Sequence, residues 1–366
     1  MKLIVTIIIL LSILMCTLPP FAAKLAEDVH VQFTEVLPSE LEIEEILPAP
    51  EPDKEAEVLA FDQPAELAML VERAKSISMM STDLKRLSVE TASTLKVYLA
   101  DEGVVREMKW EDYLAGVVLA EMYSGYGEEA LKAQAVACHS YALHKMASGS
   151  YESHKGADVC TDPGHCTAYK TYDDYADAWG KASADAAWKK ITAAVSEVAD
   201  YILTYEGKVC NAMFHASSGE MTEAAASLWD CDLPYLAAVA SFEETELTEM
   251  SLSAPQLKDK LSGLGISFTG DASGWIERAV RTEGGRVDHL LICGSEISGS
   301  MLRSRLGLRS TDFTVEYENG SFIFRVEGYG HGIGMSQAGA AAMAEMGADW
   351  RAILAHYYPG TLLEKR

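Results

Sequence analysis

Residues 111–147 read EDYLAGVVLAEMYSGYGEEALKAQAVACHSYALHKMA, and this stretch decides the fold class. Its first part, 111–122, predicts a short apolar helix with Glu121 at its end. Residues 128–147 are rich in alanine and carry two glutamates in the first turn, where negative charge stabilises a helix, so they predict a longer helix. Segments with the pattern of β-hairpins lie on both sides of this pair. Helices and hairpins in this order, without βαβ alternation, predict an α+β fold.

The flanking segments extend this pattern outward. We expect mixed helices and antiparallel hairpins that form a groove, with residues 240–300 as a smaller α+β insert. Glycine-containing turns mark the hairpins, because glycine adopts the backbone angles that tight turns require. In chain order the further expected elements are a hairpin over 94–110, a helix over 184–199, hairpins over 201–219 and 313–330, and two helices over 335–360 that separate near Gly347.

The composition limits the classes of function. The chain has 366 residues, of which 49% are hydrophobic, enough for a substantial core. Its formal net charge of −25 argues against non-specific binding to nucleic acid, which requires a basic surface. Residues 1–23 predict a membrane anchor or a signal sequence, of which we favour the uncleaved anchor. Residues 24–93 contain an acidic, proline-containing linker, and residues 94–366 then form the main domain outside the cytoplasm.

A short loop, SHKGADVCTDPGHC at 153–166, holds four potential metal ligands: His154, Cys160, His165 and Cys166. Four Cys/His ligands complete the tetrahedral shell of a structural zinc site, whereas a catalytic zinc keeps one position open. We therefore expect a structural zinc ion here. The alternative is a Cys160–Cys166 disulfide, with the two histidines as bystanders.

The chemistry is then expected elsewhere, first of all at Glu121. A carboxyl group at the end of an apolar helix is partly desolvated, which raises its pKa and suits it to donate a proton near neutral pH. An ordinary solvated glutamate at a helix end is the alternative. Lys132 and His139 lie seven residues apart in the next helix and so share a face. They are candidates for binding a ligand, and a solvated polar stripe is the alternative.

Two further segments carry candidate binding residues. HASSGEMT, at 215–222, presents Ser217 and Ser218 directly after a strand, a usual position for hydroxyls that face a ligand. GYGHGIGMSQAG, at 328–339, alternates glycine with His331 and other residues and then enters a helix at Gln337. Such a glycine run allows close approach of backbone or ligand, so we expect a platform for an extended ligand; a tight structural turn is the alternative. Neither segment fits a serine hydrolase or a dinucleotide fingerprint.

Taken in order, five stretches resemble the stage II sporulation protein D family. They are EDYLAGVVLAEM, EEALKAQAVACHSYAL, FHASSGEMTE, LPYLAAV and the run from GYGHGIGMSQAG to YYPGT, within residues 94–366. The resemblance implies that Glu121 is the essential acid and that Lys132 matches the family's lysine. The family usually has an arginine where this chain has His139, so a fixed positive charge is absent there. Clostridial members also carry a Cys/His zinc site in this loop.

The resemblance implies a lytic transglycosylase, which cleaves the β-1,4 bond between N-acetylmuramic acid and N-acetylglucosamine and leaves a 1,6-anhydro end. It also implies peptidoglycan glycan strands stripped of stem peptides as substrate, with a sporulation amidase and a membrane scaffold protein as partners. The domain would act in spore engulfment, tethered between the mother-cell and forespore membranes. Two rival functions remain open: a glycan-binding activator of an amidase, and a zinc hydrolase centred on the Cys/His loop.

Overall fold

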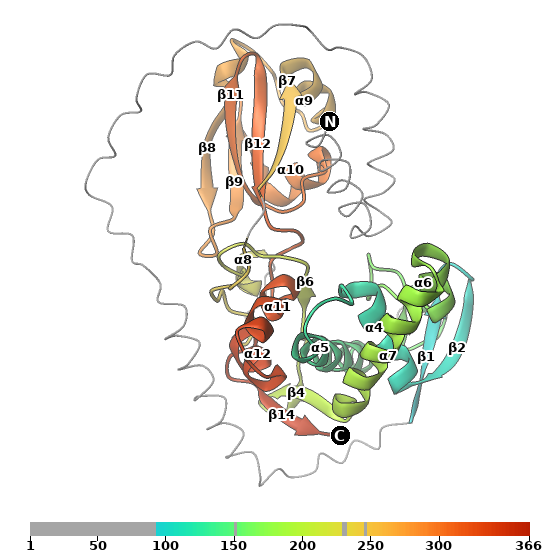
Figure 1. Ribbon diagram of the computed structural model, residues 1–366. Coiled ribbons are helices and arrows are strands. Elements are labelled where there is room, and N and C mark those ends of the chain that lie inside the picture. The colour runs from blue at the N-terminus through green and yellow to red at the C-terminus, as the bar shows by residue number, and fades with distance from the viewer. Residues whose placement is uncertain (1–92, 150–151, 229–232, 245–246) are drawn as a thin grey trace, which may run out of the picture. The chain divides into compact units, whose positions relative to one another are not determined.

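The computed structural model describes residues 93–149, 152–228, 233–244 and 247–366. The chain divides into two compact units, Met1–Phe61 and Asp62–Arg366, and the described residues all belong to the second. The expected anchor at 1–23 and nearly all of the expected linker at 24–93 lie outside the described residues. Within the described part, no helix combines the length and apolarity that crossing a membrane would require. The helices and small, mostly antiparallel sheets confirm the α+β class (Figure 1).

Three helices form the centre of the main core: α4 (Trp110–Glu121), α5 (Glu128–Ala147) and α7 (Lys181–Val198). Every residue of α5 from Ala130 to Leu143 is buried. Its small side chains allow α4 and α7 to pack closely against it on different sides, which explains the alanine-rich sequence (Figure 1). Shorter helices complete this part: η2 (Glu152–His154), α6 (Tyr172–Trp179), α8 (Ala225–Leu228), α11 (Gln337–Glu345) and α12 (Trp350–Tyr357).

Small sheets surround the helices. The predicted hairpins are confirmed as β1 (Thr94–Leu99) with β2 (Val104–Lys109), and β4 (Tyr201–Tyr205) with β5 (Lys208–Val209). The sequence did not predict three additions. They are β3 (Val159–Cys160), which pairs in parallel with β1; β6 (Phe214–His215), which pairs in parallel with β13 (Met335–Ser336); and β14 (Leu362–Lys365), which pairs with β4.

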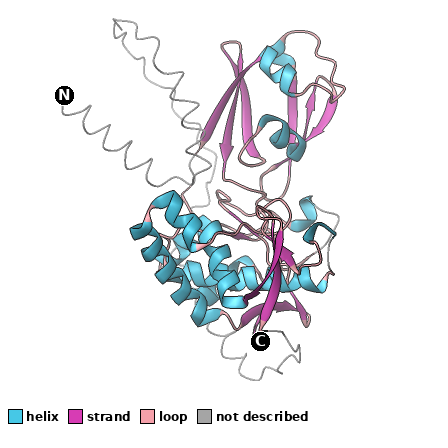
Figure 2. Ribbon diagram, turned by 90° about the vertical axis from the view of Figure 1, so that its right-hand side faces the viewer, coloured by secondary structure: helices cyan, strands magenta, loops and turns pink. Residues whose placement is uncertain are grey.

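The insert has its own hydrophobic core, and it is longer than expected. Its buried residues run from Leu252 to Val326, so it continues past residue 300 and includes the hairpin that we had placed outside it. The reason is that its last strand pairs with its first, Phe322 opposite Leu252. Figure 2 shows its strands and helices together. They are β7 (Thr248–Ser253), α9 (Ala254–Lys260), η3 (Ala272–Gly274), β8 (Ile276–Arg281), β9 (Val287–Ile292), β10 (Ser295–Ser298), α10 (Gly299–Leu306), β11 (Asp312–Glu318) and β12 (Ser321–Glu327).

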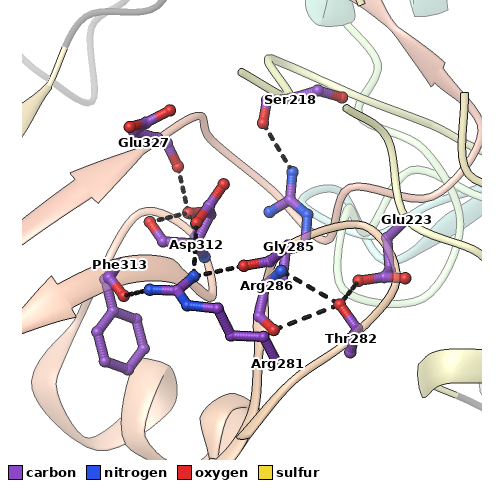
Figure 3. Close-up of polar contacts among 10 residues, drawn as sticks. Ser218, Glu223, Arg281, Thr282, Gly285, Arg286, Asp312, Phe313 and Glu327 are labelled. Atoms are coloured by element: carbon purple, nitrogen blue, oxygen red, sulfur yellow. Dashed lines mark hydrogen bonds and ion pairs between the residues drawn. The ribbon is translucent and has the colours of Figure 1, made fainter. Parts of the chain in front are cut away.

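A turn of the insert contacts the main core through Arg286 (Figure 3). The guanidinium group is fully buried and donates a hydrogen bond of 3.0 Å from Nη2 to the carbonyl oxygen of Ser218. Thr282, in the same turn, donates to the carboxylate of Glu223. A Cβ on Gly332 would lie 2.4 Å from Nε of Arg286, so only glycine allows this close approach. The insert is thereby joined to the loop that carries Ser218.

Candidate functional site

Glu121 is the last residue of α4, and its side chain is mostly buried. Its Oε1 accepts a hydrogen bond of 2.7 Å from the backbone N–H of Ala168. Burial raises the pKa of the carboxyl group, and the Ala168 N–H offsets only part of that effect. Glu121 is therefore a desolvated acid held by a single backbone donor, as the apolar helix led us to expect.

The segment 167–171 is aligned along α4 by three contacts. The hydroxyls of Tyr113 and Thr167 lie 3.2 Å apart, and the N–H of Lys170 donates to the carbonyl oxygen of Gly116 at 3.1 Å. The ring of Tyr169 lies directly over Gly116: a Cβ there would be 2.2 Å from Cε2 of the ring. Gly116 is thus required so that this segment can approach the helix and place the Ala168 N–H on Glu121.

The Cys/His loop immediately precedes this segment. One donor atom from each of His154, Cys160, His165 and Cys166 lies within 4.8 Å of all the others. Nε2 of His154 is 2.9 Å from Nδ1 of His165 and 3.4 Å from Sγ of Cys166. Nδ1 of His165 lies 3.6 Å and 3.7 Å from the two sulfur atoms. Tetrahedral zinc requires N···N and N···S separations of about 3.3 and 3.6 Å, so the donor set fits this ion.

The disulfide alternative for this loop is not realised, because both cysteines are free. β3 ends on Cys160 and pairs with β1, so the loop is anchored to a hairpin on one side. On the other side Cys166 leads directly into Thr167 and Ala168. The loop therefore connects the β1–β2 hairpin to the segment that contacts Glu121.

Lys132 is buried and enclosed by carboxylates. Its Nζ lies 2.7 Å from Glu197 and 3.1 Å from both Glu128 and Glu129. Burial alone would lower the pKa of this ammonium group, but the hydrogen bonds to the three glutamates raise the pKa above its ordinary value. The positive charge of Lys132 is thus compensated within the protein.

His139 lies apart from Glu121. Its Nδ1 is 3.1 Å from the carbonyl oxygen of Tyr201, its Nε2 is 2.9 Å from the guanidinium of Arg366, and its ring packs on Trp110. Burial and the charge of Arg366 lower the pKa of His139 to about 3, so it is neutral. Trp110 begins α4 and Glu121 ends it, which separates the two by about 16 Å at 1.5 Å per residue. The structure thus does not bring His139 to the acid.

Ser217, Ser218, His331 and Gln337 are brought together, as the two motifs led us to expect. Ser217 and Tyr329 exchange backbone hydrogen bonds of 2.8 and 3.1 Å. The rings of His215 and His331 are 5.6 Å apart, and burial with nearby arginines lowers the pKa of His331 to about 4. Gln337 is buried, and within the described part of the chain its Nε2 donates no hydrogen bond.

Ser218 is engaged internally. It is fully buried, and its hydroxyl lies 2.5 Å from Nε2 of His215. Nδ1 of His215 faces the carbonyl oxygen of Ile333 at 3.1 Å, so this nitrogen carries the hydrogen and Nε2 accepts from Ser218. Burial lowers the pKa of His215 well below its ordinary value, in agreement with a neutral ring. Ser217, half-buried, is the serine of the pair that can face a ligand.

Three residues near these segments were missed in the sequence. Tyr123 and Tyr126 follow Glu121 closely, with ring centroids 5.6 Å apart in an edge-to-face arrangement, and the ring of Tyr123 is 54% exposed. Aromatic faces of this kind suit stacking against sugar rings. Glu243 accepts hydrogen bonds from several serines. A lone glutamate or tyrosine in a loop has no distinguishing pattern, so only the fold reveals these residues.

Comparison with known proteins agrees with the site. Residues 98–205 match the family model described as stage II sporulation protein. The chain is 35% identical over 276 residues to stage II sporulation protein D of Bacillus amyloliquefaciens, covering 74% of this chain and 78% of the relative. It is 32% identical over 319 residues to the Bacillus subtilis protein of the same name, covering 84% and 90%. An amidase enhancer of Bacillus subtilis is 28% identical over 305 residues, covering 68% of this chain and 40% of that protein. The chain therefore belongs to the stage II sporulation protein D family.

Proposed function

We propose that this protein is a lytic transglycosylase that cleaves the β-1,4 bond between N-acetylmuramic acid and N-acetylglucosamine in peptidoglycan. The observation that carries the proposal is Glu121, a desolvated carboxyl group with a raised pKa at the end of an apolar helix. Membership of the family and similarity to an amidase enhancer support a role in the cell wall during sporulation. We place this role in spore engulfment.

A single carboxyl group suffices for this reaction. Protonated Glu121 donates its proton to the glycosidic oxygen, and the bond from that oxygen to the anomeric carbon breaks. The resulting carboxylate removes a proton from the C6 hydroxyl of the same muramic acid, whose oxygen then bonds to the anomeric carbon. The product is a 1,6-anhydro sugar, no water is consumed, and Glu121 is again protonated. The nucleophile is already tethered to the reacting sugar, which removes most of the entropic cost of bringing it there.

We further propose that His154, Cys160, His165 and Cys166 hold a structural zinc ion. Four donors at tetrahedral separations leave no coordination position for water, so the ion would stabilise the loop rather than act on substrate. When bound, zinc cross-links the two ends of the loop. This fixes the segment 167–171 and keeps the Ala168 N–H on Glu121.

Glycan strands stripped of stem peptides are the proposed substrate, and Ser217, His331 and Gln337 are the residues best placed to contact them. Lys132 and His139 support the helices instead, since both are buried among protein partners. The proposed location is outside the cytoplasm between the mother-cell and forespore membranes, with residues 1–23 as the anchor. A sporulation amidase and a membrane scaffold protein are the proposed partners.

The decisive experiment digests peptide-stripped glycan strands with the parent protein, Glu121→Gln and Glu111→Gln, followed by mass spectrometry. Glu111 is an exposed acid of the same helix and serves as the matched control. We expect anhydro-ended fragments from the parent and the control and none from Glu121→Gln. Fragments with reducing ends would overturn the transglycosylase mechanism.

The same digestion separates the rival functions. The relative named amidase enhancer favours a non-catalytic activator as the second candidate. It predicts no cleavage by the parent protein but faster strand processing when an amidase is added. A zinc hydrolase predicts cleavage that survives Glu121→Gln and disappears when the metal is removed.

A further inference from the structure

We infer that Glu243 is a positioning residue that assembles the glycan-binding segments around one carboxylate. Its Oε1 accepts hydrogen bonds of 2.7 Å from the backbone N–H of Ser218 and 2.7 Å from the hydroxyl of Ser336. The hydroxyl of Ser217 lies 3.5 Å from the same oxygen, and Ser241 donates to Oε2. One side chain thus joins three segments that are far apart in the sequence.

These contacts define what Glu243 can do. Four donors are directed at the two oxygens, so the carboxylate is saturated and is not a second acid or base for the reaction. Hydrogen bonds to a charged acceptor are roughly twice as strong as neutral ones, which suits a group that holds loops in place. Ser336 is also the N-cap of α11, because its Oγ accepts from the N–H of Gly339 at 3.1 Å. Glu243 therefore sets the start of that helix as well as the Ser217–Ser218 loop.

The packing around Glu243 leaves no alternative position for it. A Cβ on Gly339 would lie 2.5 Å from Oε2 of Glu243 and 2.0 Å from the hydroxyl oxygen of Tyr357. The hydroxyls of Tyr357 and Ser241 are 2.8 Å apart; since Ser241 donates to Glu243, Tyr357 donates to Ser241. A chain of oriented hydrogen bonds thus runs from α12 to the carboxylate.

The same group of segments reaches the loop after Glu121. The Cβ of Ala344, near the end of α11, lies 3.3 Å from where a Cβ on Gly127 would be. Glu243 is close enough to Tyr126 that its charge contributes to raising the pKa of that phenol, after burial. Gln337 follows Ser336 directly, and its buried amide keeps a donor for a ligand. Given the proposed function, Glu243 places Ser217 and Gln337 to bind the sugar strand that Glu121 cleaves.

The first test measures hydrogen exchange by mass spectrometry in the full chain, which requires no substrate. The variants are Glu243→Ala and Glu243→Gln, with Glu244→Ala as the matched control on the neighbouring exposed glutamate. Loss of the carboxylate is expected to speed exchange at the Ser218 and Gly339 amides by about tenfold or more. Glu243→Gln keeps an acceptor oxygen and should stay close to the parent, as should the control.

Two exchange results would overturn the inference. One is unchanged exchange at Ser218 and Gly339 in Glu243→Ala. The other is equal acceleration in the insert strands, for example β7 (Thr248–Ser253), which would indicate only a global loss of stability.

The second test measures binding of peptide-stripped strands in the non-cleaving Glu121→Gln background. Adding Glu243→Ala is expected to weaken binding about tenfold, and Glu243→Gln should restore most of it. If exchange changes but binding does not, the role of Glu243 in substrate binding is refuted. If Glu121→Gln itself binds no strand, the proposed function fails, while the exchange result still decides whether Glu243 positions the segments.

Discussion

Replacing Gly116 by alanine adds a single methyl group beneath Tyr169, and the expected effect follows from one distance. The new Cβ would lie 2.2 Å from Cε2 of the ring, whereas carbon atoms in contact are about 3.5–4.0 Å apart. The ring therefore has to move by more than about 1 Å. Such overpacking costs about 1–3 kcal/mol, and the better helix propensity of alanine offsets about 1 kcal/mol of this. We expect a net destabilisation of about 0–2 kcal/mol.

The effect on activity should be larger than the effect on stability. Tyr169 lies between Ala168, whose N–H donates to Glu121, and Lys170, whose N–H donates to Gly116. Moving the ring moves this backbone and weakens the hydrogen bond that lowers the pKa of Glu121. We therefore expect Gly116→Ala to decrease kcat by about tenfold or more, the order of a lost hydrogen bond to a charged group. The basic limb of the pH–rate profile should shift upward.

A double-mutant cycle tests this reasoning. The assay combines thermal unfolding with initial rates on stripped glycan strands for the parent, Gly116→Ala, Tyr169→Leu and the double variant. Removing the ring removes the collision, so Gly116→Ala should be tolerated in the Tyr169→Leu background. Additive effects of the two changes, or a Gly116→Ala protein with unchanged rate and pH profile, would refute the argument.

Three further predictions concern the same region. The raised pKa of Glu121 means that stability falls as pH rises from its unfolded value near 4.5 through the folded value, so Glu121→Gln should stabilise the protein increasingly between pH 4 and 8 in urea titrations; a constant difference would contradict this. Lys190→Met removes the ammonium that donates to the carbonyl oxygens of residues 124–126 and should cost about 1–2 kcal/mol and much of the activity, whereas Lys189→Met should change neither. Chelation, or Cys160→Ala, should lower Tm and increase proteolysis of the Cys/His loop as activity falls; a folded, ordered but inactive Cys160→Ala protein would argue for a catalytic metal.

The sequence predicted the elements whose pattern is local. The apolar helix ending on Glu121, the alanine-rich helix after it and the hairpin turning at Glu206 and Gly207 all have spacing or turn residues that identify them, and the structure confirms each. Two-residue strands such as β3 and β6 are too short to have a period, so their parallel pairing could not be predicted. The insert was drawn too short because its closing strand pairs with a strand nearly seventy residues earlier, between Ser253 and Ser321.

The candidate site shows the same division. Helical spacing placed Lys132 and His139 on one face, but it carries no information on what packs there, which is three glutamates for one and Arg366 for the other. The partner of Glu121 is a backbone N–H, and a backbone donor has no sequence signature at all. Glu243 depends on serines from two other segments, so it becomes recognisable only when the chain has folded.

The long-range pairing of β6 with β13 has a consequence for the order in which the protein matures. The acid, its helix and the Cys/His loop use contacts within residues 94–171, whereas Tyr358 bonds to Met213 across 145 positions. Contacts of such separation form late in folding. During synthesis, a chain shorter than about residue 330 can place Glu121 but lacks α11, α12 and the glycine run that organise Ser217 and Gln337. Cutting activity therefore arises last, when residues 333–366 close over a core that already holds its acid.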